Sequence, residues 1–382
     1  MTEKLYDRDP YLFTFRATVR ACEGEGHGYR ILLDRTAFFP CEGGQGADHG
    51  LLGDLAVRDV LLLGGELWHL TDGALPVGDE VEGRVDAVRR LRHMRVHTGE
   101  HILSGVLHRR YGATNVGFHL GDTEVTLDLD LPLTAEELAA AEEAANLAVL
   151  EDRPVRILWP SAAELPTLDY RAKLDLTEGV RLVEIEGVDL CACCAPHVLH
   201  TGECGLIKIV SHMSYKGGVR LHIAVGTDAL ADYREKQENV HAISVLLSLP
   251  EGQVADGVAR TLAALAEERR RLSSLRTVLR AERVAALPKG EDAVLLYPDL
   301  DAGALRPYAE EAAAHTGATV LVLLPTEGGC RYAIGSGREE ARARSEALHA
   351  ALGGRGGGHA ALSQGSLPAD AATVSRCFRE GC

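Results

Sequence analysis

The strongest constraint on the fold of this chain comes from two short motifs, "HTGEH" and "CCAPH", which lie far apart in the sequence. In the first motif, His97 and His101 are four residues apart within a helical pattern, so both imidazoles can face one ion. In the second, Cys193 and His197 repeat that spacing after a strand-like segment. Three histidines and one cysteine form a tetrahedral ligand set suited to zinc, and a shared ion requires the fold to bring both motifs together.

Both motifs also have interpretations without a metal. Two histidines on one helix are often surface or core residues, so the first pair alone is weak evidence. Beside the second pair, Cys191 and Cys194 offer thiolates that can compete for the ion. Only Cys193 has the four-residue spacing to His197. We therefore interpret Cys191 and Cys194 as small, half-buried residues, with ligation as the alternative.

The overall composition is that of a globular protein, with 46% hydrophobic and 25% charged residues. No apolar run approaches the roughly 20 residues needed to cross a bilayer, and the first residues lack the apolar core of an export signal. The nine cysteines include one tight cluster, unlike a secreted disulfide framework, so we expect a cytoplasmic protein. The net charge of −16 argues against nucleic-acid binding through bulk electrostatics, and RNA binding would need local basic patches.

At 382 residues the chain is long enough for several domains, and its patterns change along the sequence. Short alternating segments separated by Gly, Asp and Pro come first and predict a small sheet or barrel. A long helical stretch and then mixed strands and helices predict an α+β domain, in which Thr134 and Glu137 form a capping-box signature. Two helices and a final strand–helix alternation follow. The predicted domains are residues 1–87, 88–227, 228–288 and 289–382.

The predicted helical segment carries a stripe of apolar residues beside the charged run "EERRR". The stripe consists of Val258, Leu262, Leu265, Leu272, Leu275 and Leu279. Such a stripe either packs on the rest of its own chain or forms a coiled coil or dimer seam. We expect a homodimer.

Several motifs, taken in order, resemble one known family. The runs "HTGEHILSGVL", "CCAPHVLHTGECGLIKIV" and "KGGVRLHIAVG" are similar to the editing domain of alanyl-tRNA synthetases and of the free-standing alanyl-tRNA editing proteins, the AlaX family. Upstream, "TAFFPCEGGQGADHG" resembles the glycine-rich motif of that family, and downstream "GGRGGGHAALSQG" resembles its C-terminal DHH-associated domain. Few residues precede the glycine-rich motif, and the sequence has no Asp-His-His motif. The resemblance therefore implies a long-form free-standing editor without aminoacylation activity.

The resemblance implies a multidomain α+β fold with a zinc-containing editing domain. A small N-terminal β-barrel would carry the glycine-rich motif, and a helical spacer would lead to a C-terminal α/β DHH-associated domain. The implied zinc ligands are His97, His101, Cys193 and His197. Zinc can polarise the ester carbonyl, lower the pKa of a water molecule, or only organise the substrate. Because four protein ligands are typical of structural zinc, we favour the organising role, with water activation as the alternative.

The implied reaction is hydrolysis of the ester that joins a wrong amino acid, chiefly serine, to alanine tRNA. A site that hydrogen-bonds the serine hydroxyl can discriminate by about 10⁴–10⁵, which a pocket built for alanine cannot. By position, Thr36 resembles the family's threonine that contacts the serine side chain; the alternative is a threonine that only ends a strand. Gly43 and Gly44 permit tight turns and a close approach of the backbone to a ligand. Gln45 and Asp48 are candidates to orient water or the ester, or are merely polar tips of a hairpin.

Basic residues near these motifs are the candidates for tRNA contact. Arg89 and Arg92 belong to the run "RRLRHMR" just before the two histidines, and either contact acceptor-end phosphates or form a solvated helix face. Lys216 and Arg220 flank a Gly-Gly pair in a predicted mobile loop that can close on the terminal adenosine. Arg355 lies in the C-terminal glycine-rich run, which by resemblance holds the tRNA elbow and is otherwise a flexible linker.

The predicted function is thus a Zn²⁺-containing hydrolase that removes serine, or glycine, from mischarged alanine tRNA in trans. Its predicted partners are Ser-tRNA(Ala) and a second copy of the chain. One alternative is a zinc-bearing tRNA-binding or adaptor protein without hydrolysis. Another is an editor of a different aminoacyl-tRNA, such as a threonyl or D-aminoacyl ester.

Overall fold

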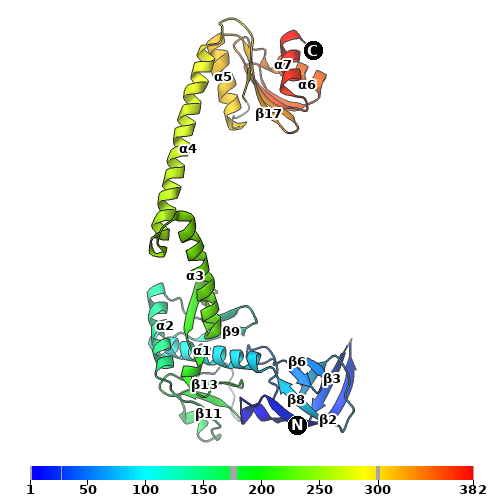
Figure 1. Cartoon of the computed structure of the whole chain (residues 1–382), viewed down its shortest axis with the longest axis vertical. Coiled ribbons are helices and arrows are strands. Elements are labelled where there is room, and N and C mark those ends of the chain that lie inside the picture. Colours follow the sequence, from blue (N-terminus) through cyan, green and yellow to red (C-terminus); the bar gives the residue numbers. More distant parts are fainter. Residues whose placement is uncertain (1, 27, 173–178, 298–301, 382) are drawn as a thin grey trace. The chain divides into compact units, whose positions relative to one another are not determined.

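The computed structural model describes residues 2–26, 28–172, 179–297 and 302–381. The chain divides into two compact units, Met1–Ile243 and Ser244–Cys382, and Figure 1 shows the elements of each. In the described ranges, no helix is both long and apolar enough to cross a membrane. The residues of the first two predicted domains thus share one unit, to which most of helix α3 also belongs.

A closed barrel of six strands begins the first unit, in the order β2-β3-β7-β6-β5-β8. Its strands are β2 (Thr14–Glu25), β3 (Gly28–Leu33), β5 (Gly50–Leu52), β6 (Leu55–Leu63), β7 (Glu66–Thr71) and β8 (Glu80–Val85). Every second residue of β8 is buried, as expected when one face of a strand lines a core. Inside the barrel lie the buried rings of Phe15 and Phe38, packed edge to face. A short parallel pair, β1 (Glu3–Lys4) with β4 (Arg35–Thr36), lies outside the barrel strands.

Helix α1 (Ala87–Tyr111) is the central element of the rest of this unit. Its N-terminus is capped by the Asp86 carboxylate, which accepts hydrogen bonds from two backbone N–H groups, and Gly112 ends it with a φ of 74°. Residues 96–105 are buried without interruption. Because a helix enclosed on all sides normally carries apolar residues, the buried polar residues of α1 must have specific partners.

Two sheets and one further helix surround α1. The four-stranded antiparallel sheet contains β14 (Ile207–Tyr215), β15 (Gly218–Val225), β10 (Val125–Leu129) and β9 (Asn115–Leu120), in that order. The three-stranded sheet contains β11 (Val155–Leu158), β12 (Leu182–Ile185) and β13 (Asp189–Ala192). Helix α2 (Ala135–Leu150) packs against α1, and the capping box predicted at Thr134 and Glu137 is confirmed.

Helices α3 (Thr227–Leu247) and α4 (Val254–Ala285) cover the segment predicted to be helical. Among the residues of α4 only Gly257 and Val284 are buried. The six apolar residues of the predicted stripe are between 40% and 60% exposed. Within the second unit these side chains therefore keep much of their surface free, and the dimer seam stays a prediction.

The second unit contains a five-stranded sheet with helices on both faces. The sheet order is β16 (Ala293–Leu296), β17 (Thr319–Thr326), β18 (Gly329–Ser336), β20 (Leu362–Leu367) and β19 (Arg355–His359). Helix α5 (Leu305–Thr316) contributes to one core, and α6 (Ala341–Leu352) and α7 (Ala371–Glu380) contribute to the other (Figure 1). Short 3₁₀ turns complete the chain, at Leu5–Asp7, Leu165–Thr167, Thr201–Cys204, Glu251–Gln253 and Ala302–Ala304.

Candidate metal centre and cavity

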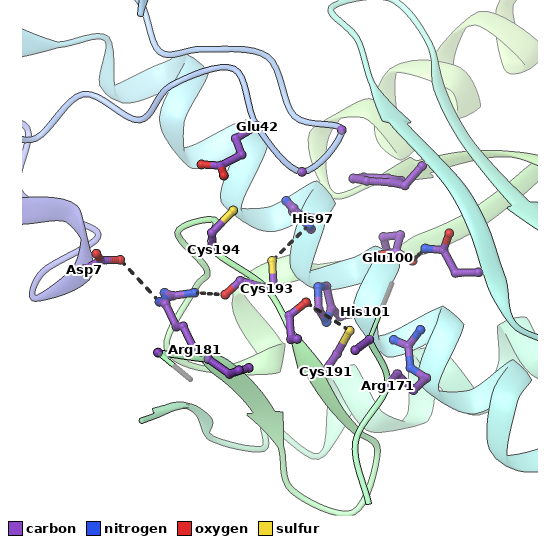
Figure 2. Close-up of a pocket in the computed structure, with 18 of the residues that line it drawn as sticks. Asp7, Glu42, His97, Glu100, His101, Arg171, Arg181, Cys191, Cys193 and Cys194 are labelled. Atoms are coloured by element: carbon purple, nitrogen blue, oxygen red, sulfur yellow. Dashed lines mark hydrogen bonds and ion pairs between the residues drawn. The ribbon is translucent and has the colours of Figure 1, made fainter. Parts of the chain in front are cut away.

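The four predicted metal ligands meet at one point. His97 and His101 come from α1, and Cys193 and His197 come from the segment that follows β13. One ligand atom of each lies within 4.8 Å of the others. The Cys193 Sγ atom is 3.6 Å from Nε2 of His97 and 3.4 Å from Nε2 of His197. Figure 2 shows Cys193 beside the imidazoles of His97 and His101.

A buried carboxylate orients one of these ligands. Nδ1 of His101 is 3.0 Å from Oδ2 of Asp189, so its proton can be donated there, which leaves Nε2 for a metal. The same carboxylate accepts two hydrogen bonds from the Arg171 guanidinium, at 2.7 and 2.8 Å. Partners of this kind fix the tautomer of a metal-binding histidine and raise its basicity.

The other two histidines have partners at the same ring atom. Nδ1 of His97 is 2.9 Å from Oε1 of Gln45, and Nδ1 of His197 is 2.9 Å from the Thr98 hydroxyl oxygen. Both oxygens can accept a hydrogen bond from an Nδ1–H group. In that tautomer all three histidines present Nε2 to the same point. Imidazole nitrogens with one thiolate suit zinc, and the residues present therefore fit this ion.

The electrostatics of the cluster also favour a metal. Burial lowers the pKa of His197 to about 3, so its imidazole is neutral at physiological pH. Burial alone would raise the pKa of the Cys193 thiol, but the neighbouring His97 and His197 lower it well below its usual range. The pKa of His101 moves the other way: burial lowers it, yet Cys191, Asp189 and Cys193 together raise it well above its ordinary value. The Cys193 thiolate can bind a cation directly, whereas a protonated His101 must release its Nε2 proton before it can act as a ligand.

Three residues of the cluster, His97, His101 and Cys193, line a cavity of about 590 Å³. One wall is the glycine-rich loop with Gly43 and Gly44, another is α1, and a third is formed by residues on either side of β13. The lining includes the charged side chains of Glu42, Glu100 and Arg181 (Figure 2). A cavity of this size, mostly apolar with a few polar groups, is typical of a small-molecule or ligand-end site.

The two predicted loop glycines are required by the backbone. Gly43 and Gly44 have φ of 65° and 84°, in the left-handed region that favours glycine. A Cβ atom on Gly44 would lie 2.3 Å from the carbonyl oxygen of Phe118 in β9. The Gly44 carbonyl also accepts a hydrogen bond of 2.8 Å from the Leu120 N–H. The prediction of tight turns is confirmed, and the close approach attaches the barrel loop to the sheet beside α1.

Thr36 lies outside the lining of the cavity. It is fully buried, and its Oγ1 is 2.8 Å from Nε2 of His69 and accepts a hydrogen bond of 3.1 Å from the Phe38 N–H. Burial lowers the pKa of His69 to about 4, so this imidazole is neutral at physiological pH. A contact between Thr36 and a ligand would require its hydroxyl to exchange one of these partners.

Asp48 and Gln45 also lie outside the lining of the cavity, although both are fully buried. The Asp48 carboxylate accepts hydrogen bonds from the Arg90 guanidinium, with Nε 3.1 and 3.0 Å from the two oxygens, and from the Phe39 N–H at 2.7 Å. Arg90 is fully buried as well and also donates to the Ala37 carbonyl. These contacts make Asp48 part of a buried ion pair between the barrel loop and α1.

Two of the predicted tRNA-binding arginines are already in ion pairs. Nη1 of Arg89 lies 2.5 Å from an Asp122 carboxylate oxygen, and its Nε donates to the Ala47 carbonyl. Nε of Arg92 lies 2.8 Å from Oδ2 of Asp228. Nearby carboxylates thus neutralise part of the positive charge of the segment "RRLRHMR".

The remaining basic candidates differ in their partners. Arg220 donates to both carboxylate oxygens of Asp128 and stacks on Tyr215, with 3.9 Å from Cζ to the ring centroid. Lys216 lies over the same ring, at 5.0 Å, and forms the β14–β15 turn with a φ of 48°. Arg355 is exposed on β19. Among the residues that the structure describes, Lys216 and Arg355 form no ion pair, so their charges are available to a polyanion.

Sequence reasoning missed several residues that support the cluster. Arg181 is a clear case: its Nη1 donates to the carbonyls of Cys193 and Ala195, at 2.7 and 2.9 Å. Its Nε lies 3.5 Å from the Asp7 carboxylate, at the N-terminal end of the unit. Neither Arg181 nor the Asp189–Arg171 pair belongs to a motif. Their roles come from strand pairing, which brings residues distant in sequence together.

Comparisons with known proteins match two parts of the chain to domain families. Residues 180–222 match the threonyl and alanyl tRNA synthetase second additional domain, and residues 291–375 match the DHHA1 domain. The alanyl-tRNA editing protein AlaX-M of Methanosarcina mazei is 40% identical over 230 residues, which cover 55% of this chain and 90% of that protein. Aarsd1, an alanyl-tRNA editing protein of Rattus norvegicus, is 33% identical over 54% of each chain.

The chain is also similar to full-length synthetases. The alanine–tRNA ligase of Korarchaeum cryptofilum is 32% identical over 405 residues, which cover 97% of this chain but only 44% of the ligase. The chain thus spans less than half the length of that relative. Since it instead covers nine-tenths of AlaX-M at 40% identity, the chain belongs to the alanyl-tRNA editing protein family.

Proposed function

We propose that this protein is an aminoacyl-tRNA hydrolase that removes serine from mischarged alanine tRNA, acting in trans on tRNA charged by another enzyme. The observation that carries this proposal is the cluster of His97, His101, Cys193 and His197, of which all but His197 line a cavity of about 590 Å³. The names of the similar editing proteins support the reaction class. Because this reaction serves translation, we also propose a cytoplasmic location.

The four ligands would hold Zn²⁺, which supplies a positive charge that can polarise an ester carbonyl or a water molecule when bound. Four protein ligands form a closed set, which favours a role in ordering the cavity. In this proposal Gln45 and Asp189 keep Nε2 of His97 and His101 directed at the ion. Arg181 keeps the segment that carries Cys193 in place through its two carbonyl contacts.

Discrimination between serine and alanine is proposed to depend on Thr36. The family resemblance assigns the serine side chain to this residue, and the Thr36 hydroxyl has the required ability to donate and accept. The Thr36 hydroxyl now bonds to Nε2 of His69. A serine hydroxyl would therefore replace the His69 imidazole as the partner of Thr36, or would bond to Thr36 while that contact is kept. Glycine esters, which lack a side chain, would gain nothing from Thr36 and would be edited less well.

The test is deacylation of serine-charged and alanine-charged alanine tRNA, with zinc quantified on the same protein sample. Rapid loss of serine alone is expected. Cys193→Ala is expected to lower zinc content and activity together, because it removes one of four ligands. Cys22→Ala is the matched control: this half-buried thiol belongs to β2 of the barrel, so zinc and activity should stay at wild-type levels.

Two outcomes would favour the alternatives. A protein with a full complement of zinc that cleaves neither ester would be a binding module or adaptor. Cleavage of another aminoacyl ester, with the serine ester untouched, would keep the hydrolase and change its substrate. Full zinc retention by Cys193→Ala would show that the metal site is wrongly assigned.

We also propose that the protein is a homodimer through the apolar stripe of α4. The stripe residues follow a spacing of three and four residues over most of their length, and Leu262 and Leu275 are each 60% exposed. Sedimentation equilibrium should give twice the mass of one chain, and Leu262→Glu should give the monomer. A monomeric wild-type protein would refute this contact.

A further inference from the structure

Trp159 is the most exposed aromatic side chain in the lining of the cavity, at 57% exposed. It directly follows β11, whose last residue, Leu158, packs against the small core formed by Leu165, Val180 and Leu182. Successive residues of an extended strand point to opposite faces, so Trp159 leaves that core and turns to the cavity. Among the described residues, Trp159 belongs to none of the core clusters, so its ring is free to contact a ligand in the cavity.

Strand register places Trp159 close to the metal ligands. Leu158 pairs with Leu182, and Leu182 pairs with Ala192, so these residues form one row across the three-stranded sheet. One residue further along, the Cys193 N–H donates to the Arg181 carbonyl at 3.1 Å. Extending the register by one residue puts Trp159 in the same row as Arg181 and Cys193. Trp159 is therefore two strands away from the metal ligand Cys193, which corresponds to about 10 Å between their backbones.

We propose that Trp159 is the stacking platform for the terminal adenine of the tRNA. This inference rests on the proposed function, in which the reacting ester is carried by the ribose of the last nucleotide. With the ester at the cluster of His97, His101, Cys193 and His197, the attached base lies one sugar away, within reach of Trp159 in the same cavity. Nucleic-acid ends are commonly held by stacking of bases on aromatic side chains, which needs no base pairing and tolerates a flexible strand.

Other aromatic side chains of the lining are less suited to this role. The Phe118 ring is packed at 5.0 Å from the His97 ring and contributes to the main core of the unit. Tyr6 is 2% exposed and packs edge to face on Phe39. Both rings are thus already used inside the protein, whereas Trp159 keeps most of its surface free for a base.

The chain offers a direct optical test, because it contains two tryptophans. Trp68, the other one, lies on β7 of the barrel, where the Arg30 guanidinium covers its ring at 5.1 Å. In the Trp68→Phe variant of the full chain, all tryptophan fluorescence comes from Trp159. The probe is 3′-serylamido-3′-deoxyadenosine, a seryl nucleoside whose amide replaces the cleavable ester, and its binding is measured independently by equilibrium dialysis.

Stacking of adenine on Trp159 is expected to quench this fluorescence with the same Kd that dialysis gives. The cytidine counterpart, with a smaller ring, should bind more weakly. Binding in dialysis without any change of fluorescence would overturn the inference, and so would the absence of binding.

Kinetics with the charged tRNA provide a second test. Trp159→Leu is expected to raise KM for seryl-tRNA by about 5- to 150-fold, the range that loss of one stacked base gives, with kcat and zinc content unchanged. Trp159→Phe keeps an aromatic face and should stay close to wild type, which separates stacking from a general loss of fold. Equal KM values for wild type and Trp159→Leu would refute stacking and leave the proposed hydrolysis intact. If the wild type cleaves no seryl ester, the proposed function fails, and the fluorescence titration still decides whether Trp159 binds a base.

Discussion

Replacing Asp48 by asparagine would separate a structural role of this carboxylate from a catalytic one. Asp48 and Arg90 are both 0% exposed, and the carboxylate is the ionic partner of the guanidinium. The asparagine amide would keep an acceptor for the Phe39 N–H but would leave the charge of Arg90 buried without a counter-ion. Removing one partner of a buried ion pair costs about 3–5 kcal/mol.

This cost should be visible in the thermal transition of the first unit. For a unit of 150–250 residues, each kcal/mol corresponds to roughly 2–4 °C, so the expected decrease in Tm is about 6–20 °C. Asp54→Asn is the matched control, because Asp54 is exposed on the same part of the barrel and should change Tm little. The double variant Asp48→Asn with Arg90→Met should be less destabilised than the sum of the two single variants, since it no longer buries an unpaired charge.

The assay is circular dichroism on heating, combined with deacylation at a temperature well below the transition of every variant. The structural role predicts a large decrease in Tm with the specific activity of the folded fraction close to wild type. An Asp48→Asn protein that melts like the Asp54→Asn control yet has lost activity would refute this reasoning. Asp48 would then act on water or the ester, as the sequence interpretation holds.

The other predictions concern the metal and the buried hydroxyl pair. Gln45→Leu should weaken zinc binding by about 10- to 100-fold in a chelator competition, because Nδ1 of His97 loses its acceptor; unchanged affinity would contradict this role. The pKa of His69 is about 4 in the folded protein and about 6.5 when unfolded, so the unfolded state binds more protons between these values. Stability should therefore fall as the pH decreases from about 6.5 to 4, by about 3 kcal/mol from this residue, and denaturant titrations of His69→Gln should lack this part of the loss. Thr36→Val should reduce cleavage of seryl-tRNA with zinc content unchanged; a wild-type protein that cleaves seryl and alanyl esters equally would exclude a role of Thr36 in selectivity.

The sequence predicts which His and Cys side chains gather, because both pairs share a four-residue spacing. His97 and His101 lie on one face of α1, and the four-residue step from Cys193 to His197 groups the second pair without knowledge of the fold. The capping box and the loop glycines are equally local, since each depends on a few consecutive residues. Predictions of this kind require only the backbone geometry of one element.

The partners of these residues could not be predicted in the same way. Arg171 and Asp189, for example, meet through a bridge between a loop and β13, and nothing in their local sequence marks them. Asp48 lies in a motif, but its ionic partner Arg90 is 42 residues away, and only the tertiary structure pairs them. Nothing in the local sequence marks Trp159 either; only the sheet register and the cavity lining place it on the same side as Cys193, two strands away.

The separation between the two halves of the metal cluster has a consequence for synthesis of the protein. His97 and Cys193 are 96 residues apart, so at about 5–20 residues per second the ribosome needs roughly 5–20 s to add the second half. During this interval the nascent chain offers only His97 and His101 of the four cluster residues, and two ligands bind a metal weakly. The proposed zinc would be captured firmly only after most of the unit has been made, so metal loading would follow folding of the surrounding sheets, and zinc content would report on how much of the protein has matured.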